Sequence, residues 1–158
     1  MTVFKIVKNE KIEITDNTLP VVNIKAISDE FVPVFSTSQA AGADLKSSVD
    51  IVLKPGKVEM VDAGFCCKIP DGYHAKIAAR SSMGKKGIIV PNGPGIIDSD
   101  YILGIKVLLL NLSDTDYEIK KGDRIAQWIL EKNISYAWIA SEHLESTERS
   151  GGFGSTGK

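Results

Sequence analysis

Short apolar runs alternate with turn signals along most of this 158-residue chain. The segments between the turns are rich in Val, Ile, Tyr and Phe, which favour strands. The clearest predicted strands cover residues 57–69, 73–78, 105–110 and 125–130. The turn signals are Pro55-Gly56, Pro70-Asp71-Gly72, Pro91-Asn92-Gly93-Pro94, Asp114-Thr115-Asp116 and Lys121-Gly122-Asp123. Short strands at this spacing predict an all-β sandwich or barrel.

Helical periodicity is missing almost everywhere, and the best helical segment is a short turn that begins near Ser81. Ser81 or Ser82 is expected to cap this turn, which leaves backbone N–H groups free at its start. Such groups attract anions, and the neighbouring Arg80 supplies a guanidinium for charge-assisted bonds to phosphate. A capped surface turn with no ligand explains these residues equally well.

The composition, 43% hydrophobic and 25% charged, is typical of one soluble globular domain. The formal net charge of -1 argues against stable nucleic-acid binding, because that affinity comes from many Lys and Arg that neutralise phosphates. The N-terminal residues show no export signal, and no apolar run is long enough to predict a membrane span.

The two cysteines, Cys66 and Cys67, are adjacent. Adjacency excludes an ordinary disulfide between them and offers no C-x-x-C metal spacing. In a strand the two side chains point to opposite faces. We therefore expect reduced packing residues and a cytoplasmic protein, or one in the host-cell cytoplasm if the chain is viral.

The most informative segment is Gly95-Ile96-Ile97-Asp98-Ser99-Asp100-Tyr101, in which carboxylates lie between an apolar run and an aromatic ring. A carboxylate held against aliphatic neighbours loses hydration and becomes a better proton acceptor near neutral pH. Asp98 is therefore the leading candidate for a general base. The alternative is that both aspartates are ordinary turn residues.

Two further segments carry candidate chemistry. Gln127 follows the turn at residues 122–124 and stands among apolar neighbours, so its amide needs partners in the fold or in ligand-bound water. The glycine-rich end of the chain holds one large aromatic, Phe153, between glycines. We predict a folded core at residues 1–145 and a flexible arm at residues 146–158 that orders over a ligand, with a disordered terminus as the alternative.

Five ordered segments together resemble the motifs of the trimeric dUTPases. They are Ala41-Gly42-Ala43-Asp44-Leu45, Arg80-Ser81-Ser82-Met83, residues 95–101, residues 122–127 and Gly152-Phe153-Gly154-Ser155-Thr156-Gly157. The resemblance implies a jelly-roll-like distorted β-barrel that forms a homotrimer, with the C-terminal arm crossing to a neighbour. It also implies hydrolysis of dUTP to dUMP and pyrophosphate with Mg2+, which limits uracil in DNA and supplies dUMP for dTTP synthesis.

The resemblance also assigns roles to residues at matching positions. Asp98 would activate the water that attacks the α-phosphorus, and Tyr101 would pack under the deoxyribose. Magnesium would have no direct protein ligand and would be held by phosphates and waters, with Asp44 and Gln127 around those waters. The remaining implied substrate-binding residues are Arg80, Ser81, Ser82, Asn92, Gly95, Ile97, Arg149, Phe153, Gly154, Ser155 and Thr156.

Three positions depart from the family pattern. Ala79 stands where proline is usual, Leu103 stands where glycine is common, and only Ser150 separates Arg149 from Gly151. The last difference makes the register of Arg149 on the terminal phosphate less certain than that of Phe153.

Two other functions compete with dUTP hydrolysis. A dCTP deaminase of the same superfamily shares the fold, but it needs a different acid–base residue and usually lacks the Gly-Phe-Gly arm. A dUTPase-fold regulator that binds a protein partner is the second alternative. Several remaining residues are expected to be structural: Trp128 and Trp138 in core or subunit contacts, and His74 and His143 without zinc.

Overall fold

The computed structural model describes residues 4–8, 10–13, 15, 18–149 and 151. The strands are β1 (Phe4–Val7), β2 (Glu10–Glu13), β3 (Asn23–Ala26), β4 (Val34–Phe35), β5 (Ala43–Lys46), β6 (Ile51–Leu53), β7 (Val58–Lys68), β8 (Tyr73–Ala78), β9 (Ile88–Ile89), β10 (Gly95–Ile97), β11 (Gly104–Asn111), β12 (Tyr117–Ile119) and β13 (Arg124–Lys132). The helical elements are the 3-10 turn η1 (Asp29–Phe31) and the single helical turn α1 (Ser81–Gly84).

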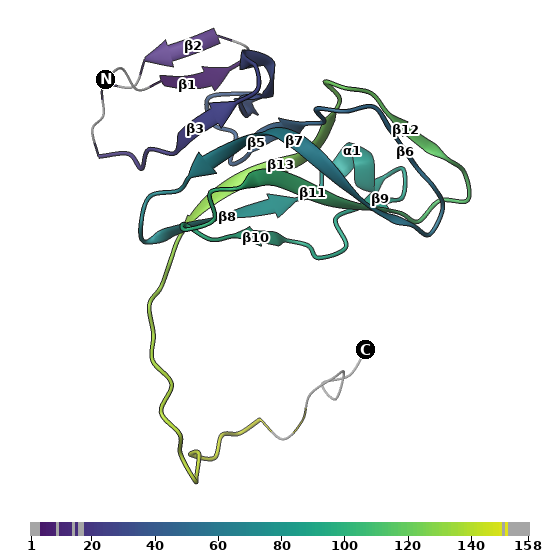
Figure 1. Cartoon of the computed structure of the whole chain (residues 1–158). Coiled ribbons are helices and arrows are strands. Elements are labelled where there is room, and N and C mark those ends of the chain that lie inside the picture. The colour runs from purple at the N-terminus through teal and green to yellow at the C-terminus, as the bar shows by residue number, and fades with distance from the viewer. Residues whose placement is uncertain (1–3, 9, 14, 16–17, 150, 152–158) are drawn as a thin grey trace.

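The strands form three sheets (Figure 1). A seven-stranded sheet has the order β10-β8-β13-β5-β4-β1-β2, and a four-stranded sheet has the order β3-β7-β11-β9. The short strands β12 and β6 pair at one end. The fold is therefore mostly β, as the sequence predicts.

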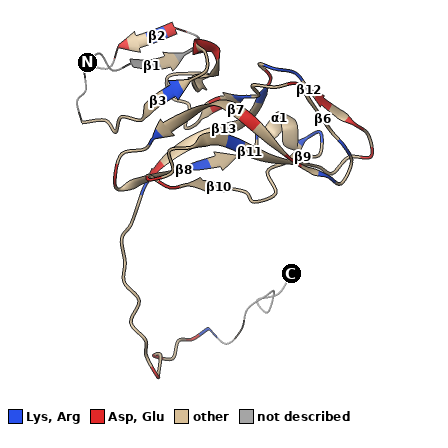
Figure 2. Ribbon diagram, viewed as in Figure 1, with Lys and Arg blue, Asp and Glu red and all other residues tan. Residues whose placement is uncertain are grey.

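The core lies between the two larger sheets, because alternate residues of each strand point inward. Phe65 of β7 and Trp128 of β13 meet edge to face, with ring centroids 5.9 Å apart. This contact joins the two sheets and confirms that Trp128 is a core residue. Acidic and basic residues are interspersed over the strands and loops around this core (Figure 2).

The predicted strands are confirmed as β7, β8, β11 and β13, with ends that shift by a few residues. The helical turn also begins at Ser81, but the predicted serine cap is wrong. Arg80 is the N-cap residue, and no side chain makes a capping bond. The extended backbone of Arg80 directs its carbonyl toward the amides of Met83 and Gly84, both at 3.0 Å, so both serines lie inside the turn.

Both cysteines are free thiols, as predicted; Cys67 is buried and Cys66 is half-buried. Burial raises the pKa of the Cys67 thiol to about 11, and the neighbouring Cys66 adds a smaller effect in the same direction. Cys67 thus stays protonated at neutral pH and acts as an apolar packing residue. Within the described residues, no helix is long and apolar enough to cross a membrane.

Gly64 is placed in β7 where only glycine fits. Its φ is +77°, and a Cβ there would lie 2.8 Å from Cγ of Phe31 and 3.0 Å from Cβ of Ser48. The Gly64 carbonyl also accepts a 2.9 Å bond from the Ile27 amide. The glycine therefore lets the segment that carries Ile27 and Phe31 pack closely on β7.

We expect Gly64→Ala to lower the free energy of unfolding by about 2–4 kcal/mol, because it combines an unfavourable backbone angle with a clash against Phe31. The matched control is Gly72→Ala, where φ is +81° but nothing lies within 4 Å of the new methyl group. Its expected cost is about 1–2 kcal/mol. Urea unfolding at fixed protein concentration measures both, and equal costs would contradict the packing argument.

Candidate active site

Strand register brings two predicted site residues side by side. Gln127 of β13 lies opposite Asp44 of β5 on one side and opposite Ala78 of β8 on the other. Directly paired residues of antiparallel strands share one face of a sheet. The adjacent row, Ala43, Trp128 and Ile77, is buried in the core, so the Asp44 row lies on the outer face.

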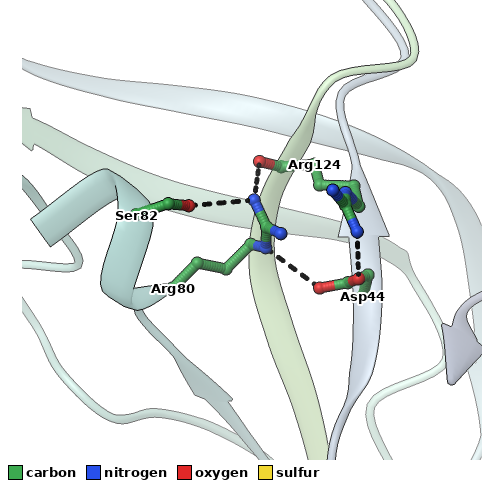
Figure 3. Close-up of polar contacts among 4 residues, drawn as sticks. All are labelled: Asp44, Arg80, Ser82 and Arg124. Carbon is green, nitrogen blue, oxygen red and sulfur yellow. Dashed lines mark hydrogen bonds and ion pairs between the residues drawn. The ribbon is translucent and has the colours of Figure 1, made fainter. Parts of the chain in front are cut away.

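Asp44 is held between two arginines (Figure 3). Its Oδ1 accepts a 3.0 Å bond from Nε of Arg80, and its Oδ2 accepts a 3.2 Å bond from Nη1 of Arg124. Asp44 is only 7% exposed, and a buried carboxylate is stable only when it is paired in this way. We refer to Asp44, Arg80 and Arg124 as the arginine clamp.

The clamp also fixes which edge of Arg80 is available. Nη1 of Arg80 donates to Oγ of Ser82 at 3.3 Å and to the main-chain carbonyl of Arg124 at 3.2 Å. Together with the Nε bond to Asp44, these contacts leave Nη2 as the nitrogen with no hydrogen bond among the described residues. A guanidinium oriented in this way can bind an anion through its Nη2 edge.

The two arginines of the clamp line a cleft of about 420 Å³ next to α1 and β12. Arg80, Arg124 and Lys86 contribute positive charge, and Ser82 contributes a hydroxyl. The cleft also has the carboxylates Asp116, Glu118 and Asp123. The cleft is therefore lined by both cationic and anionic groups.

Asp98 lies elsewhere on the same sheet, just after the edge strand β10. Its expected burial against aliphatic neighbours is not found within one chain, where Asp98 is exposed and Ile96 is 52% exposed. The physical reason is that an edge strand has a neighbour on only one side. Asp98 and Ile96 line a second, open hollow of about 680 Å³ with His74 and the start of the C-terminal segment.

Three hydrogen bonds hold the turn that carries Asp98. The Tyr101 amide donates to the Asp98 carbonyl at 3.2 Å, and the Tyr101 hydroxyl donates to the Gly104 carbonyl at 3.1 Å. Lys68, at the end of β7, donates from Nζ to the Ser99 carbonyl at 3.0 Å. The main chain of this turn is thus fixed from both sides.

The predicted base-binding residues Asn92, Gly95 and Ile97 form one turn-and-strand unit. A Cβ on Gly95 would lie 3.2 Å from Nδ2 of Asn92, so the missing side chain makes room for the amide. Gly95 and Ile97 pair with Ile77 and Ala75 of β8. The unit therefore belongs to the Asp98 end of the sheet rather than to the arginine clamp.

Beyond β13 the chain leaves the sheets as an extended segment (Figure 1). Arg149 is exposed, and its hydrogen bonds are local, to Thr147 and Gly151. Phe153, Gly154, Ser155 and Thr156 lie outside the described residues, so their roles stay predictions. The predicted division of the chain at residue 145 also stays a prediction.

Residues expected to be structural have mixed outcomes. Trp138 is 87% exposed, so it fills no core within one chain. His74 lies 2.6 Å from Oδ1 of Asn133 through its Nδ1. The described part of the chain contains no group of three His, Cys, Asp or Glu placed to hold a metal ion.

Two residues of the site were missed from sequence. Arg124 stands inside the motif at residues 122–127, and its place in that motif was the available signal for a role. Lys68 had no signal, because its bond to the Ser99 carbonyl joins residues 31 apart in sequence.

An all-β fold with an oriented guanidinium beside two serines is a candidate phosphate-binding protein. The dUTPase family model matches residues 30–157, and the chain belongs to the dUTPase family. It is 45% identical over 140 residues to the deoxyuridine 5'-triphosphate nucleotidohydrolase of Nautilia profundicola, covering 87% of this chain and 99% of that protein. It is 40% identical over 128 residues to the enzyme of that name from Helicobacter pylori, covering 80% and 88%.

Solved structures agree on the fold. A variant of the dUTPase of Staphylococcus bacteriophage 80alpha with dUpNHpp superposes with a TM-score of 0.77 at 23% identity, covering 87% of this chain and 98% of that one. The dUTPase of Streptococcus mutans gives a TM-score of 0.69 at 24% identity, covering 73% and 99%. The fold is therefore the jelly-roll of these dUTPases.

We expect Lys68→Met to speed amide hydrogen exchange at Tyr101 about fivefold, because the Ser99 carbonyl loses a charge-assisted bond worth roughly 1 kcal/mol. Lys68→Arg should preserve most of the protection. Lys25→Met, on the neighbouring strand β3, is the matched control and should leave the exchange unchanged. Unaltered exchange at Tyr101 in Lys68→Met would mean that Lys68 does not hold this turn.

Proposed function

We propose that this protein hydrolyses dUTP to dUMP and pyrophosphate in the cytoplasm. The observation that carries the proposal is the arginine clamp, because it fastens three of the five dUTPase-like segments together on one sheet face. The names of the relatives support the same substrate. The two free cysteines are consistent with a reducing compartment.

We infer that the working site needs more than one copy of the chain. Ile97, next to Asp98, pairs with Ala75, whereas Arg80 lies five residues further along the same extended segment. At about 3.3 Å per residue this separation is about 17 Å, which is longer than a triphosphate. The two hollows also share no lining residue.

The outer face of the four-stranded sheet supports assembly into the predicted homotrimer. Val58 and Met60 of β7, 50% and 59% exposed, lie opposite Leu110 and Leu108 of β11. An apolar sheet face of this kind is typical of a contact between chains.

In the proposed mechanism Asp98 accepts a proton from a water that attacks the α-phosphorus. The bond from that phosphorus to the oxygen that bridges to the β-phosphorus breaks, and pyrophosphate leaves with that oxygen. Bound Mg2+ would neutralise phosphate charge. One structural neighbour, the dUTPase of phage phi11, is described with a structural Mg(II) ion.

Chain residues bind and orient the substrate around that step. Arg80, Ser81, Ser82 and Gln127 would contact the phosphates. Asn92 and the main chain at Gly95 and Ile97 would read uracil, and Tyr101 would pack on the deoxyribose. The arm would close with Phe153 on the base and with Arg149, Gly154, Ser155 and Thr156 at the terminal phosphate. Stacking of Phe153 is expected to contribute about 1–3 kcal/mol.

The test is pyrophosphate release from dUTP, dCTP, dTTP and UTP with Mg2+. We expect turnover of dUTP only, and Asp98→Asn should lower kcat about 10²–10⁴-fold through loss of the base. Asp100→Asn, an exposed aspartate of the same turn, is the matched control and should change kcat less than about threefold.

Ammonia release from dCTP without dUTP turnover would instead identify a deaminase. A folded wild-type protein that releases neither product would contradict the enzymatic proposal and favour a protein-binding role. Equal losses in Asp98→Asn and Asp100→Asn would contradict the assignment of Asp98 as the base.

A further inference from the structure

We propose that Arg124 is a positioning residue for nucleotide binding: through Asp44 it fixes the guanidinium of Arg80. The inference rests on the proposed function, because its consequence is the affinity for a nucleoside triphosphate.

Two contacts fix the orientation of the Asp44 carboxylate. Each of its two oxygens receives one charge-assisted bond, from Arg80 at 3.0 Å and from Arg124 at 3.2 Å. Because the two donors hold opposite ends of a planar group, they fix its rotation. The Asp44 side chain is 8% exposed, so water contributes little to its solvation.

The contacts of Arg80 fix the orientation of its guanidinium. A guanidinium has five N–H donors, and Arg80 uses Nε and Nη1 on Asp44, Ser82 and the Arg124 carbonyl. The fixed carboxylate therefore decides where the free Nη2 edge of Arg80 points. The clamp holds two positive charges and one negative charge, and its net positive charge suits a polyphosphate.

The two arginine side chains differ in exposure, so the substitution that tests the proposal is made at Arg124. The Arg124 side chain is 54% exposed, whereas that of Arg80 is 18% exposed. Replacing the Arg124 side chain removes its bond to Oδ2 of Asp44 and one positive charge from the cleft. The bond from Arg80 to the main-chain carbonyl of Arg124 remains possible in the variant. The variant therefore lacks the bond to Asp44, and strand β13 keeps its main-chain pairing.

The first experiment measures calorimetric affinity for the non-hydrolysable analogue dUpNHpp, once with EDTA and once with Mg2+. We expect Arg124→Met and Asp44→Asn each to weaken binding at least tenfold in both conditions. The double variant should be no more than about threefold weaker than the weaker single variant, since both changes break one unit. Arg124→Lys should recover part of the loss.

Lys120→Met is the matched control, because Lys120 is a 60% exposed cation with only surface ion pairs, close to Arg124 in sequence. It should bind like the wild type. Multiplicative losses in the double variant would overturn the proposal. A loss in Asp44→Asn that appears only with Mg2+ would also overturn it, by assigning Asp44 to the metal waters.

A second readout needs no nucleotide and separates this inference from the proposed function. The Nε–H of Arg80 gives a nitrogen-15 NMR signal that Arg80→Lys identifies by its loss. We expect slow hydrogen exchange at this group in the wild type and at least tenfold faster exchange in Arg124→Met. Unchanged exchange would overturn the clamp even in an active dUTPase, whereas a wild type that neither binds dUpNHpp nor hydrolyses dUTP would overturn the function alone.

Discussion

The spacing of residues along β8 is the constraint on which the rest of the account depends. One end of this strand pairs with β10 and the Asp98 turn, and the other end leads directly to Arg80. An extended chain cannot shorten, so about 17 Å separates the two ends. In the proposed account each chain contributes two half-sites, and the Asp98 end of one copy meets the arginine clamp of another.

The clamp makes one of those half-sites rigid. Asp44, Arg80 and Arg124 belong to segments far apart in sequence, and the buried carboxylate of Asp44 is their common partner. Removing one partner of a buried ion pair leaves an uncompensated charge, so the three residues depend on one another. The other half-site is held differently: hydrogen bonds from Tyr101 and Lys68 fix the main chain of a turn, and the carboxylate of Asp98 stays exposed.

The sequence predicted the features that depend on neighbouring residues, namely the strands and the helical turn. Alternating apolar residues between turn signals predicted β7, β8, β11 and β13, and Ser81 marked the helical turn. Contacts between segments far apart in sequence could not be predicted. Arg124 donates a hydrogen bond to a carboxylate 80 residues away, so the residues near Arg124 in sequence do not indicate its partner. The expected burial of Asp98 is not found, because β10 is an edge strand with a neighbour on only one side and Ile96 stays exposed.

Subunit complementation tests the central claim most directly. Asp98→Asn and Arg80→Gln are each purified as inactive proteins, then unfolded and refolded together in equal amounts. If each site takes Asp98 from one copy and Arg80 from the next, random mixing restores about a quarter of the sites, and dUTP turnover returns to about a quarter of the wild-type value. No recovery in a mixture shown to contain mixed oligomers would contradict a site shared between copies.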